Sequence, residues 1–537
     1  MSDRAAPLGA MPSSHRALAG AGDLLALVGF GLACAIGFAG AFIGLDSHGF
    51  WFDELYTVRI IAPSDPAELF ARLGADVHPP LFGLVLSVYS KVAGLSEVGL
   101  RSFSAVAACA AVLLFVASTG RSFSLQGRLF GAAMATGSLF WFLHSQNARP
   151  YALCLLVSVS ILALSLQLLA EPRDRARSNQ ALAGLAVLVF VGAFVHFYLL
   201  YESLAVLIVL ALLRPDRRRA ILAIGLSLVA VMSLYVLLVT MNFSQANLES
   251  NWVRNDPTWY RLVLESCLHY ALGSAGAVAL VLCGVVFVFY RTSSRAENIG
   301  REIAWGRFPL DAMAGLLFGV PILVLAGSIV SSTLFTPNFF DRSFLILSPF
   351  LWAFCARLYD ESVAVTPGPA RLALTLALSA VVLAMASIVV QRLPPERPGL
   401  LYEPFRESAE WIRGLGDCRG EVVPVLSTDR KDWYKPGYGE ALYADIYGRY
   451  LDGFARPQLV FVEDAVAGTI PADLRAELER RVAGHGCPIV AWSVHNIPQV
   501  TMTKAVNALL AVRAPVKAEA FSDGQTGYVT VLERKSR

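Results

Sequence analysis

Charge is scarce in this sequence, and its two signs are nearly balanced. Only 16% of the 537 residues are charged, and 44 Lys and Arg against 41 Asp and Glu give a net charge of +3. Because no basic stripe or tail is present, the sequence predicts no nucleic-acid partner. The eight cysteines include no CxxC pair, which argues against a structural zinc site of the finger or ribbon type.

Apolar residues are abundant instead, with 56% hydrophobic residues and a mean hydropathy of +0.56. This composition is typical of a polytopic membrane protein. Apolar runs of about 17 to 25 residues are long enough to cross the hydrocarbon layer as helices. We identify eleven such runs, near 24–45, 98–119, 128–145, 150–170, 181–197, 198–213, 219–241, 268–290, 311–334, 343–359 and 371–391.

The placement of basic residues predicts the orientation, because cationic loops are retained in the cytoplasm. With the N-terminus inside, the inner segments carry 17 Arg and the outer loops before residue 391 carry 7 Arg and Lys. We therefore expect a multi-pass plasma (inner) membrane protein with a cytoplasmic tail at 1–23 and a transmembrane domain at 24–391. The C-terminal part is then periplasmic or otherwise extracytoplasmic.

A further apolar run, 79–95, is expected to lie on the outer membrane surface as an interfacial helix. It offers only about 15 suitable residues, opens with Pro79-Pro80 and contains Lys91. A full span there would reverse the later loops and place their arginine clusters outside. Residues 46–97 then form one long outer segment.

The composition changes at residue 392, where PPERPG (394–399) is interpreted as a linker. Beyond it, short β-type runs alternate with helical patterns, which predicts a small soluble α/β domain at 392–537. In an oxidising compartment Cys418 and Cys487 either pair as a disulfide or remain two buried thiols, and their spacing leaves both alternatives open.

The outer segment 46–97 holds the densest set of ionisable residues near the membrane, which marks it as a candidate site. Asp53 and Glu54 are adjacent in FWFDELYTVRI, and Asp76 and His78 precede the diproline. A carboxylate near other carboxylates and apolar side chains should have a raised proton affinity, which suits a general base. We assign that role to Asp53. The alternative is that Asp53 and Glu54 only cap and solvate a surface helix.

Four fragments in order carry a family resemblance: FDELY (52–56), DVHPPLFG (76–83), GLSEVGLRSFSA (94–105) and SQNARPYAL (145–153). Together they resemble the opening of the polyprenyl-phosphate-sugar-dependent glycosyltransferases of the GT-C fold. Asp-Val-His-Pro-Pro is similar to the protein O-mannosyltransferases, and Asp-Glu-x-x-Tyr to the lipid A aminoarabinose transferases. The resemblance covers about residues 24–360 and implies about 11 to 13 transmembrane helices.

The resemblance implies a hexosyl- or pentosyltransferase that moves a sugar from a polyprenyl-phosphate carrier to an acceptor hydroxyl on the outer face. The acceptor would be a glycolipid, lipopolysaccharide or other envelope glycan, and the bilayer is the third partner. Asp53 takes the position of the catalytic carboxylate and Glu54 is the second catalytic residue of that motif. Tyr56, which completes the motif, Asp76 and His78 are the candidate substrate-loop residues. Because a phosphate leaving group needs no general acid, one base suffices, and direct displacement inverts the anomeric centre.

The departing phosphate needs positive charge, which the planar fork of arginine supplies well. The candidates in the outer segments are Arg149, Arg254 and Arg342, with Tyr151 beside the first. The alternative for any single arginine is that it anchors a helix end by snorkelling.

A divalent metal ion is the one cofactor that the resemblance raises. Some aminoarabinose transferases bind a metal through a Glu just before the diproline and a His in a later outer loop. Here Val77 replaces that Glu and the 242–267 loop has no His; the nearest metal ligands would be Asp76 and His78. His196, near an outer helix end, is either a further substrate-site residue or a satisfied interhelical histidine.

Two other functions are compatible with this topology. A secondary transporter has a similar number of spans, but it predicts charges near mid-membrane and two related halves. An envelope sensor or assembly protein with an outer recognition domain would leave the FDELY and DVHPP segments unexplained. The outer cluster of charges favours the glycosyltransferase.

Overall fold

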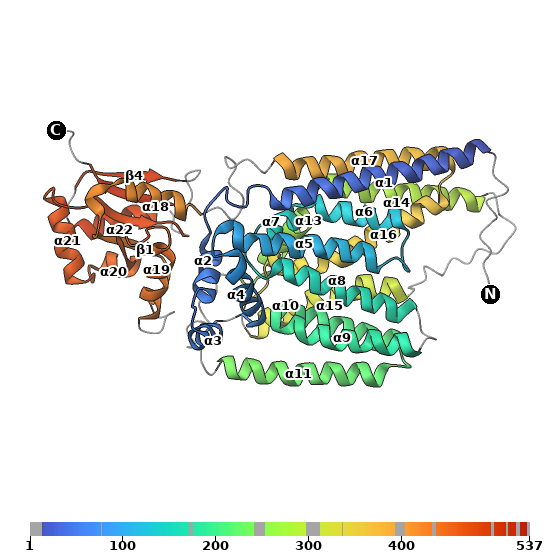
Figure 1. Ribbon diagram of the computed structural model, residues 1–537, viewed down its shortest axis with the longest axis horizontal. Helices are drawn as coiled ribbons and strands as arrows, with labels where there is room; N and C mark the ends of the chain where they lie inside the picture. Colours follow the sequence, from blue (N-terminus) through green and yellow to red (C-terminus); the bar gives the residue numbers. More distant parts are fainter. Residues whose placement is uncertain are drawn as a thin grey trace.

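The computed structural model describes residues 13–76, 78–170, 175–240, 253–296, 312–335, 337–391, 403–431, 437–495, 499–511, 514–521 and 527–533. A helical bundle and a smaller sheet-containing domain lie end to end (Figure 1). The predicted linker at 394–399 and Val77 lie outside the described residues. The domain boundary at 391/392 therefore stays a prediction.

The bundle confirms the polytopic helical fold class. Within the described residues, eight helices are long and apolar enough to cross a membrane. They are α1 (Ser13–Phe42), α5 (Glu97–Ser118), α8 (Tyr151–Ala170), α9 (Arg175–Val195), α11 (Arg218–Thr240), α14 (Gly273–Ala296), α15 (Ala312–Leu334) and α17 (Gly368–Gln391).

The remaining predicted runs are also helical. Two of them form α10 (Phe197–Leu213) and α16 (Ser348–Val365), while the run at 128–145 is broken into α6 (Leu125–Thr136) and α7 (Leu139–Ser145). Ser138 causes the restart, because its side chain accepts a hydrogen bond from the Trp141 N–H at 3.2 Å and caps α7.

Small residues let the helices approach closely. In Figure 1, α1 and α17 run side by side along the bundle. A Cβ added at Gly29 would overlap the side chain of Ser379, and one at Gly131 would overlap the backbone of Trp352. Membrane helices pack in this way where van der Waals contact replaces the hydrophobic effect.

One end of the bundle carries short helices from the segments that the sequence predicts to be outer. They are α2 (Phe52–Ile61), α3 (Pro66–Gly74), α4 (Leu81–Ala93), α13 (Pro257–Ala271) and the 3₁₀ helix η2 (Asp341–Leu347). α4 has 13 residues and is about 20 Å long, shorter than the hydrocarbon layer of about 30 Å. Its length therefore fits the interfacial position predicted for 79–95. The start of α1 lies at the opposite end of the bundle (Figure 1).

The C-terminal domain is a five-stranded mixed sheet of order β2-β1-β3-β5-β4. β1 is parallel to β2 and β3, whereas β5 is antiparallel to β3 and β4. The strands are β1 (Val422–Ser427), β2 (Arg456–Phe461), β3 (Ile489–Ser493), β4 (Val516–Ala520) and β5 (Tyr528–Leu532). The helices are α18 (Phe405–Gly414), η3 (Gly416–Cys418), α19 (Tyr438–Gly448), α20 (Val462–Ala467), α21 (Ala472–Val482) and α22 (Gln499–Leu510). The predicted α/β organisation is therefore confirmed.

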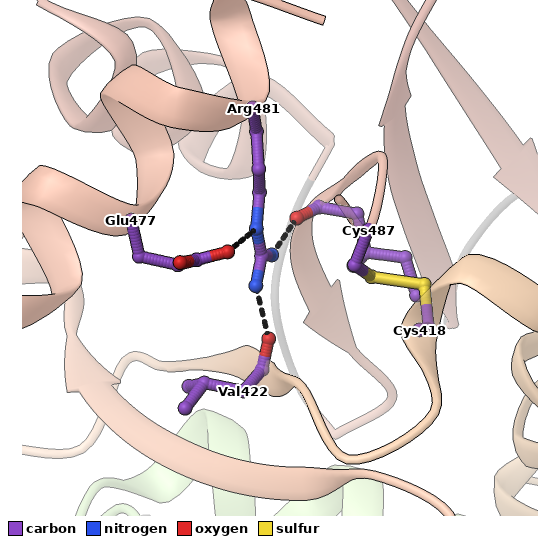
Figure 2. Close-up of a disulfide and its surroundings, with 6 residues drawn as sticks. Cys418, Val422, Glu477, Arg481 and Cys487 are labelled. Carbon is purple, nitrogen blue, oxygen red and sulfur yellow. Dashed lines mark hydrogen bonds and ion pairs between the residues drawn. A yellow bond between two sulfur atoms is a disulfide. The ribbon is translucent and has the colours of Figure 1, made fainter. Parts of the chain in front are cut away.

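Cys418 and Cys487 form a disulfide, with their Cα atoms 4.3 Å apart (Figure 2). The pairing answers the question that the spacing left open. Beside it, the buried Arg481 donates hydrogen bonds to Glu477 Oε1 at 2.9 Å and to the Val422 carbonyl at 2.6 Å. These contacts join α21 to the first strand of the sheet.

We predict that Cys418→Ser lowers the free energy of unfolding of the C-terminal domain by about 4 kcal/mol, because the disulfide closes a loop of 69 residues. Thermal unfolding with and without reductant measures the loss, and Cys109→Ser is the control for a thiol outside the disulfide. Alkylation of both Cys418 and Cys487 in native, unreduced protein would contradict the pairing.

Candidate active site

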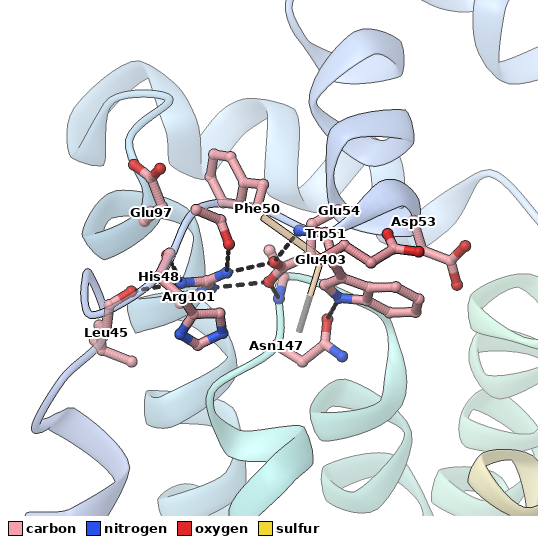
Figure 3. A network of polar contacts seen from close by, with 12 residues as sticks. Leu45, His48, Phe50, Trp51, Asp53, Glu54, Glu97, Arg101, Asn147 and Glu403 are labelled. Carbon is pink, nitrogen blue, oxygen red and sulfur yellow. Dashed lines mark hydrogen bonds and ion pairs between the residues drawn. The ribbon is translucent and has the colours of Figure 1, made fainter. Parts of the chain in front are cut away.

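The first turn of α2 directs two neighbouring carboxylates to different partners. The helix begins at Phe52, so Asp53 and Glu54 lie where the N-terminal end of the helix dipole favours negative charge. Figure 3 shows Glu54 within a network around Arg101 and Asp53 on the far side of the Trp51 ring. Adjacent residues in sequence therefore occupy different environments.

Glu54 is completely buried and binds Arg101 through two hydrogen bonds. Nε donates to Oε1 at 2.9 Å and Nη2 to Oε2 at 2.6 Å, and both side chains are 1% exposed. Oε1 also accepts from the Ala148 N–H at 2.7 Å. The same guanidinium donates to the carbonyls of Leu45, His48 and Gly49 at 2.8 to 3.0 Å. Glu54 was predicted as a catalytic residue; its contacts instead fit a residue that holds the outer segment on α5.

Asp53 faces two of the predicted arginines. Its Oδ2 lies 3.1 Å from Arg342 Nη1 and 3.9 Å from Arg149 Nη2, and its side chain is 22% exposed. Burial acts to raise the pKa of Asp53, but Arg149 and Arg342 outweigh it and hold the pKa below the ordinary value of 3.8. The predicted rise in the proton affinity of Asp53 is therefore wrong. The prediction considered only its neighbours in the sequence, which are carboxylates, whereas its neighbours in space are arginines.

Arg149 is held by residues from the same outer segment. It donates to the Asp53 carbonyl at 3.1 Å and to Thr57 Oγ1 at 3.0 Å, and its Nη2 lies 3.4 Å from His78 Nε2. His78 Nδ1 lies 3.0 Å from Asp76 Oδ1. A guanidinium only donates, so this geometry assigns the proton to Nδ1 and leaves Nε2 as the acceptor.

Tyr56 joins this chain, and its hydroxyl donates to Asp76 Oδ1 at 3.4 Å. Burial favours protonation of Asp76, but His78 outweighs it and lowers the pKa of the carboxyl group. Three residues predicted to be substrate-loop residues, Tyr56, Asp76 and His78, thus form a series of hydrogen bonds that ends on Arg149.

Aromatic and imidazole rings line the other side of the cluster. Arg342 lies over the Trp51 ring at 5.5 Å and over Phe340 at 5.2 Å, a cation–π geometry. Tyr151 is buried, with its ring centroid 5.9 Å from that of His196, which in turn lies 6.4 Å from His78.

Arg254 is placed differently from the other predicted arginines. It pairs with Asp256 at 2.9 Å, and its side chain is 65% exposed. Asp256 at the same time caps α13, accepting from the Trp259 N–H at 2.9 Å. The described contacts of Arg254 thus belong to the start of α13, whereas Arg149 and Arg342 meet at Asp53.

Two buried donors, one on Arg149 and one on Asn147, are not used by the contacts above. Within the part of the chain that the structure describes, Arg149 Nε and Asn147 Nδ2 have no hydrogen-bond partner. The Trp51 indole N–H donates to Asn147 Oδ1 at 3.3 Å, which fixes the orientation of the amide. Buried unpaired donors are costly, so an anion or a polar ligand with several acceptor atoms suits this position.

Asp76 and His78, the candidate metal ligands, lie next to each other, with His78 Nδ1 3.0 Å from Asp76 Oδ1. They supply one oxygen and one nitrogen, and across the described residues no group of three or more His, Cys, Asp or Glu side chains is positioned to hold an ion. His78 Nε2 also faces a guanidinium.

Arg101 and Asn147 are functional residues that the sequence patterns do not single out, although both lie in the fragments that carry the family resemblance. A charged residue inside an apolar run was the signal for Arg101. Asn147 had no comparable signal, because a polar residue at a helix boundary is common. Glu403, which accepts a hydrogen bond from the Phe52 N–H of α2, and His495 beside it come from the C-terminal domain, which the resemblance does not cover.

We predict that Arg101→Met lowers the free energy of unfolding by about 3 to 5 kcal/mol, because it leaves the Glu54 charge buried without its partner. The matched control is Arg261→Met, which breaks the exposed pair with Glu265 and should cost at most about 1 kcal/mol. Thermal unfolding in detergent gives both values. Equal effects of the two changes would contradict the structural role of the pair.

Comparison with known proteins supports the fold. No family model matches the chain, and no curated protein matches its sequence. Among solved structures, ArnT from Cupriavidus metallidurans in the apo state matches with a TM-score of 0.56 at 12% identity, covering 93% of this chain and 97% of that chain. The same protein bound to undecaprenyl phosphate matches with a TM-score of 0.55 at 12% identity and the same 93% and 97% coverage.

A weaker match is the Archaeoglobus fulgidus oligosaccharyltransferase in complex with Zn and sulfate. Its TM-score is 0.41 at 11% identity, over 80% of this chain and 62% of that chain. The fold assignment comes from ArnT, whose match spans both the bundle and the C-terminal domain. The chain has the GT-C fold, as its sequence resemblance implies.

Proposed function

We propose that this protein is a membrane glycosyltransferase that transfers a sugar from a polyprenyl-phosphate carrier to an acceptor hydroxyl. The observation that carries the proposal is the placement of one carboxylate, Asp53, against two arginines at the bundle end that faces the C-terminal domain. A base and a phosphate site must lie within the width of one sugar ring for this reaction, on opposite faces of the anomeric carbon, since the hydroxyl attacks the carbon that the phosphate leaves.

The phosphate is assigned to Arg149, Arg342 and Asn147. Negative charge builds up on the phosphate as it departs, and two guanidinium groups provide the positive charge that stabilises it. The unpaired donors Arg149 Nε and Asn147 Nδ2 support this assignment. ArnT, which shares the fold, has been crystallised with undecaprenyl phosphate, and we extend that class of ligand to this chain.

In the proposed reaction, the acceptor oxygen bonds to the anomeric carbon while its proton passes to Asp53. The bond between that carbon and the phosphate oxygen breaks, and its electron pair stays on the carrier phosphate. Attack opposite to the leaving group inverts the anomeric centre. The acceptor is assigned to a glycolipid, lipopolysaccharide or other envelope glycan on the extracytoplasmic side of the inner membrane.

Donor binding also provides a way to switch on the base. Without donor, Arg149 and Arg342 lower the pKa of Asp53 and make it a weak base. A phosphate bound by the same arginines would neutralise their charge, and the proton affinity of Asp53 would rise. The base then gains strength only when the leaving group is in place.

We expect Asp53→Asn to abolish sugar transfer while donor binding persists, because the amide keeps the size of the side chain and cannot take the proton. Mass spectrometry of envelope glycolipids from cells that carry each variant measures the product. Asp46→Asn, at an exposed position of the same outer segment, is the control. Wild-type product levels from Asp53→Asn would exclude it as the base.

Arg149→Ala and Arg342→Ala should each weaken binding of a polyprenyl phosphate by at least about tenfold, because each removes a charged hydrogen-bond donor. Binding to the purified protein in nanodiscs measures the change. The exposed Arg261→Ala is the control, and Arg254→Ala tests the remaining predicted arginine. Unchanged affinity in both Arg149→Ala and Arg342→Ala would contradict the phosphate site.

A further inference from the structure

The C-terminal domain is docked on the outer segment that carries Asp53. One hydrophobic cluster joins the two, with Phe50 and Leu55 from the outer segment and Phe405, Tyr447 and Trp492 from the domain. A cluster that includes side chains from both parts resists separation, since opening it would expose large aromatic surfaces to water. The domain is therefore a fixed neighbour of α2.

Polar contacts surround this shared cluster. Tyr450 accepts a hydrogen bond from the Phe50 N–H at 2.6 Å and donates to Glu97 Oε1 at 2.6 Å. On α2 itself, Arg59 Nε lies 2.8 Å from Asp445 Oδ2 of α19. These contacts hold the domain near both ends of α2, before Phe52 and in the last turn at Arg59.

The carboxyl ends of the parallel strands β1 and β3 lie at one edge of the sheet, and that edge meets α2. Glu403, just before α18, accepts a hydrogen bond from the Phe52 N–H, the first helical amide of α2, at 2.7 Å. His495, two residues beyond β3, lies with Nδ1 2.5 Å from Glu403 Oε1. Its ring stacks on Phe52 with centroids 4.3 Å apart and an interplanar angle of 19°.

Glu403 supplies what the local sequence does not. The residue before α2 is Trp51, whose side chain has no acceptor for the first-turn amides, so an outside carboxylate caps the helix. Its negative charge also suits the positive end of the helix dipole. Glu54, two residues along the same turn, is held from the other side by Arg101.

Building on the proposed function, we propose that Glu403 and His495 of the C-terminal domain are positioning residues that orient the first turn of α2, and with it Asp53, for catalysis. The charges around His495 are Glu403, Asp429 and Asp53. The Glu403 carboxylate accepts a hydrogen bond from the Phe52 N–H, and the imidazolium of His495 pairs with the same carboxylate and holds it in place. On this proposal, the C-terminal domain contributes two residues that orient the catalytic carboxylate.

The link makes the site sensitive to pH. Burial alone would lower the pKa of His495, but Glu403 outweighs burial and raises it above the ordinary 6.5. The ion pair is fully formed below pH 6.5 and is lost as the pH rises through the raised pKa. The first turn of α2 should then loosen.

The test uses Glu403→Gln and His495→Gln in the full-length protein, with the exposed Glu410→Gln and His485→Gln as matched controls. Hydrogen–deuterium exchange of the peptide that contains Phe52 to Tyr56 measures the stability of the turn between pH 5.5 and 8.5. We expect protection in the wild type to fall by about tenfold as His495 loses its proton. Both variants should lack this pH dependence, whereas the controls should retain it.

A second readout separates positioning from general stability. Both variants should bind polyprenyl phosphate with wild-type affinity and form at least about tenfold less glycolipid product. Wild-type protection of the turn, wild-type product levels, or loss of lipid binding in Glu403→Gln and His495→Gln would each overturn the inference. If the wild type itself transfers no sugar, the proposed function fails instead, and the exchange result still reports on the turn.

Discussion

The buried ion pair between Glu54 and Arg101 is the constraint on which the rest of the site depends. Two charges at 1% exposure must stay together, so the outer segment can dock on α5 in only one register. Arg101 strengthens this by binding three carbonyls of the chain that leads into α2. The position of Asp53, one residue earlier in the helix, follows from that docking.

Two adjacent carboxylates therefore have separate tasks, set by what surrounds each of them. Glu54 is inaccessible and fully paired, while Asp53 is partly exposed and lies against two arginines, which we propose also bind the phosphate of the donor. The chain from Tyr56 through Asp76 and His78 to Arg149 keeps one of these arginines in place. From the opposite side, the C-terminal domain caps the same turn. The first turn of α2 is therefore held from three parts of the chain: by Arg101 of α5, by the hydrogen bonds that end on Arg149, and by the C-terminal domain.

Much of the fold could be predicted from the sequence because hydropathy is a local property. All eleven apolar runs are helical, and the short run at 79–95 is too short to span. Less of the candidate site could be predicted from the sequence. The loop that contains Asp53 could be found from its charges, but its partners come from distant segments: Arg101 lies 47 positions from Glu54, and Arg149 lies 96 positions from Asp53. The sign of the Asp53 pKa shift was wrong for that reason: the nearest charges in space are arginines from distant segments. The disulfide likewise required the fold of the sheet.

The most direct measurement of the central claim is a cryo-electron microscopy structure of the protein in nanodiscs with a polyprenyl phosphate bound. The account predicts phosphate density in contact with Arg149 and Arg342, near the Asn147 amide, with the Asp53 carboxylate no longer paired to both arginines. A phosphate bound away from these residues, with the Asp53 ion pairs intact, would contradict it.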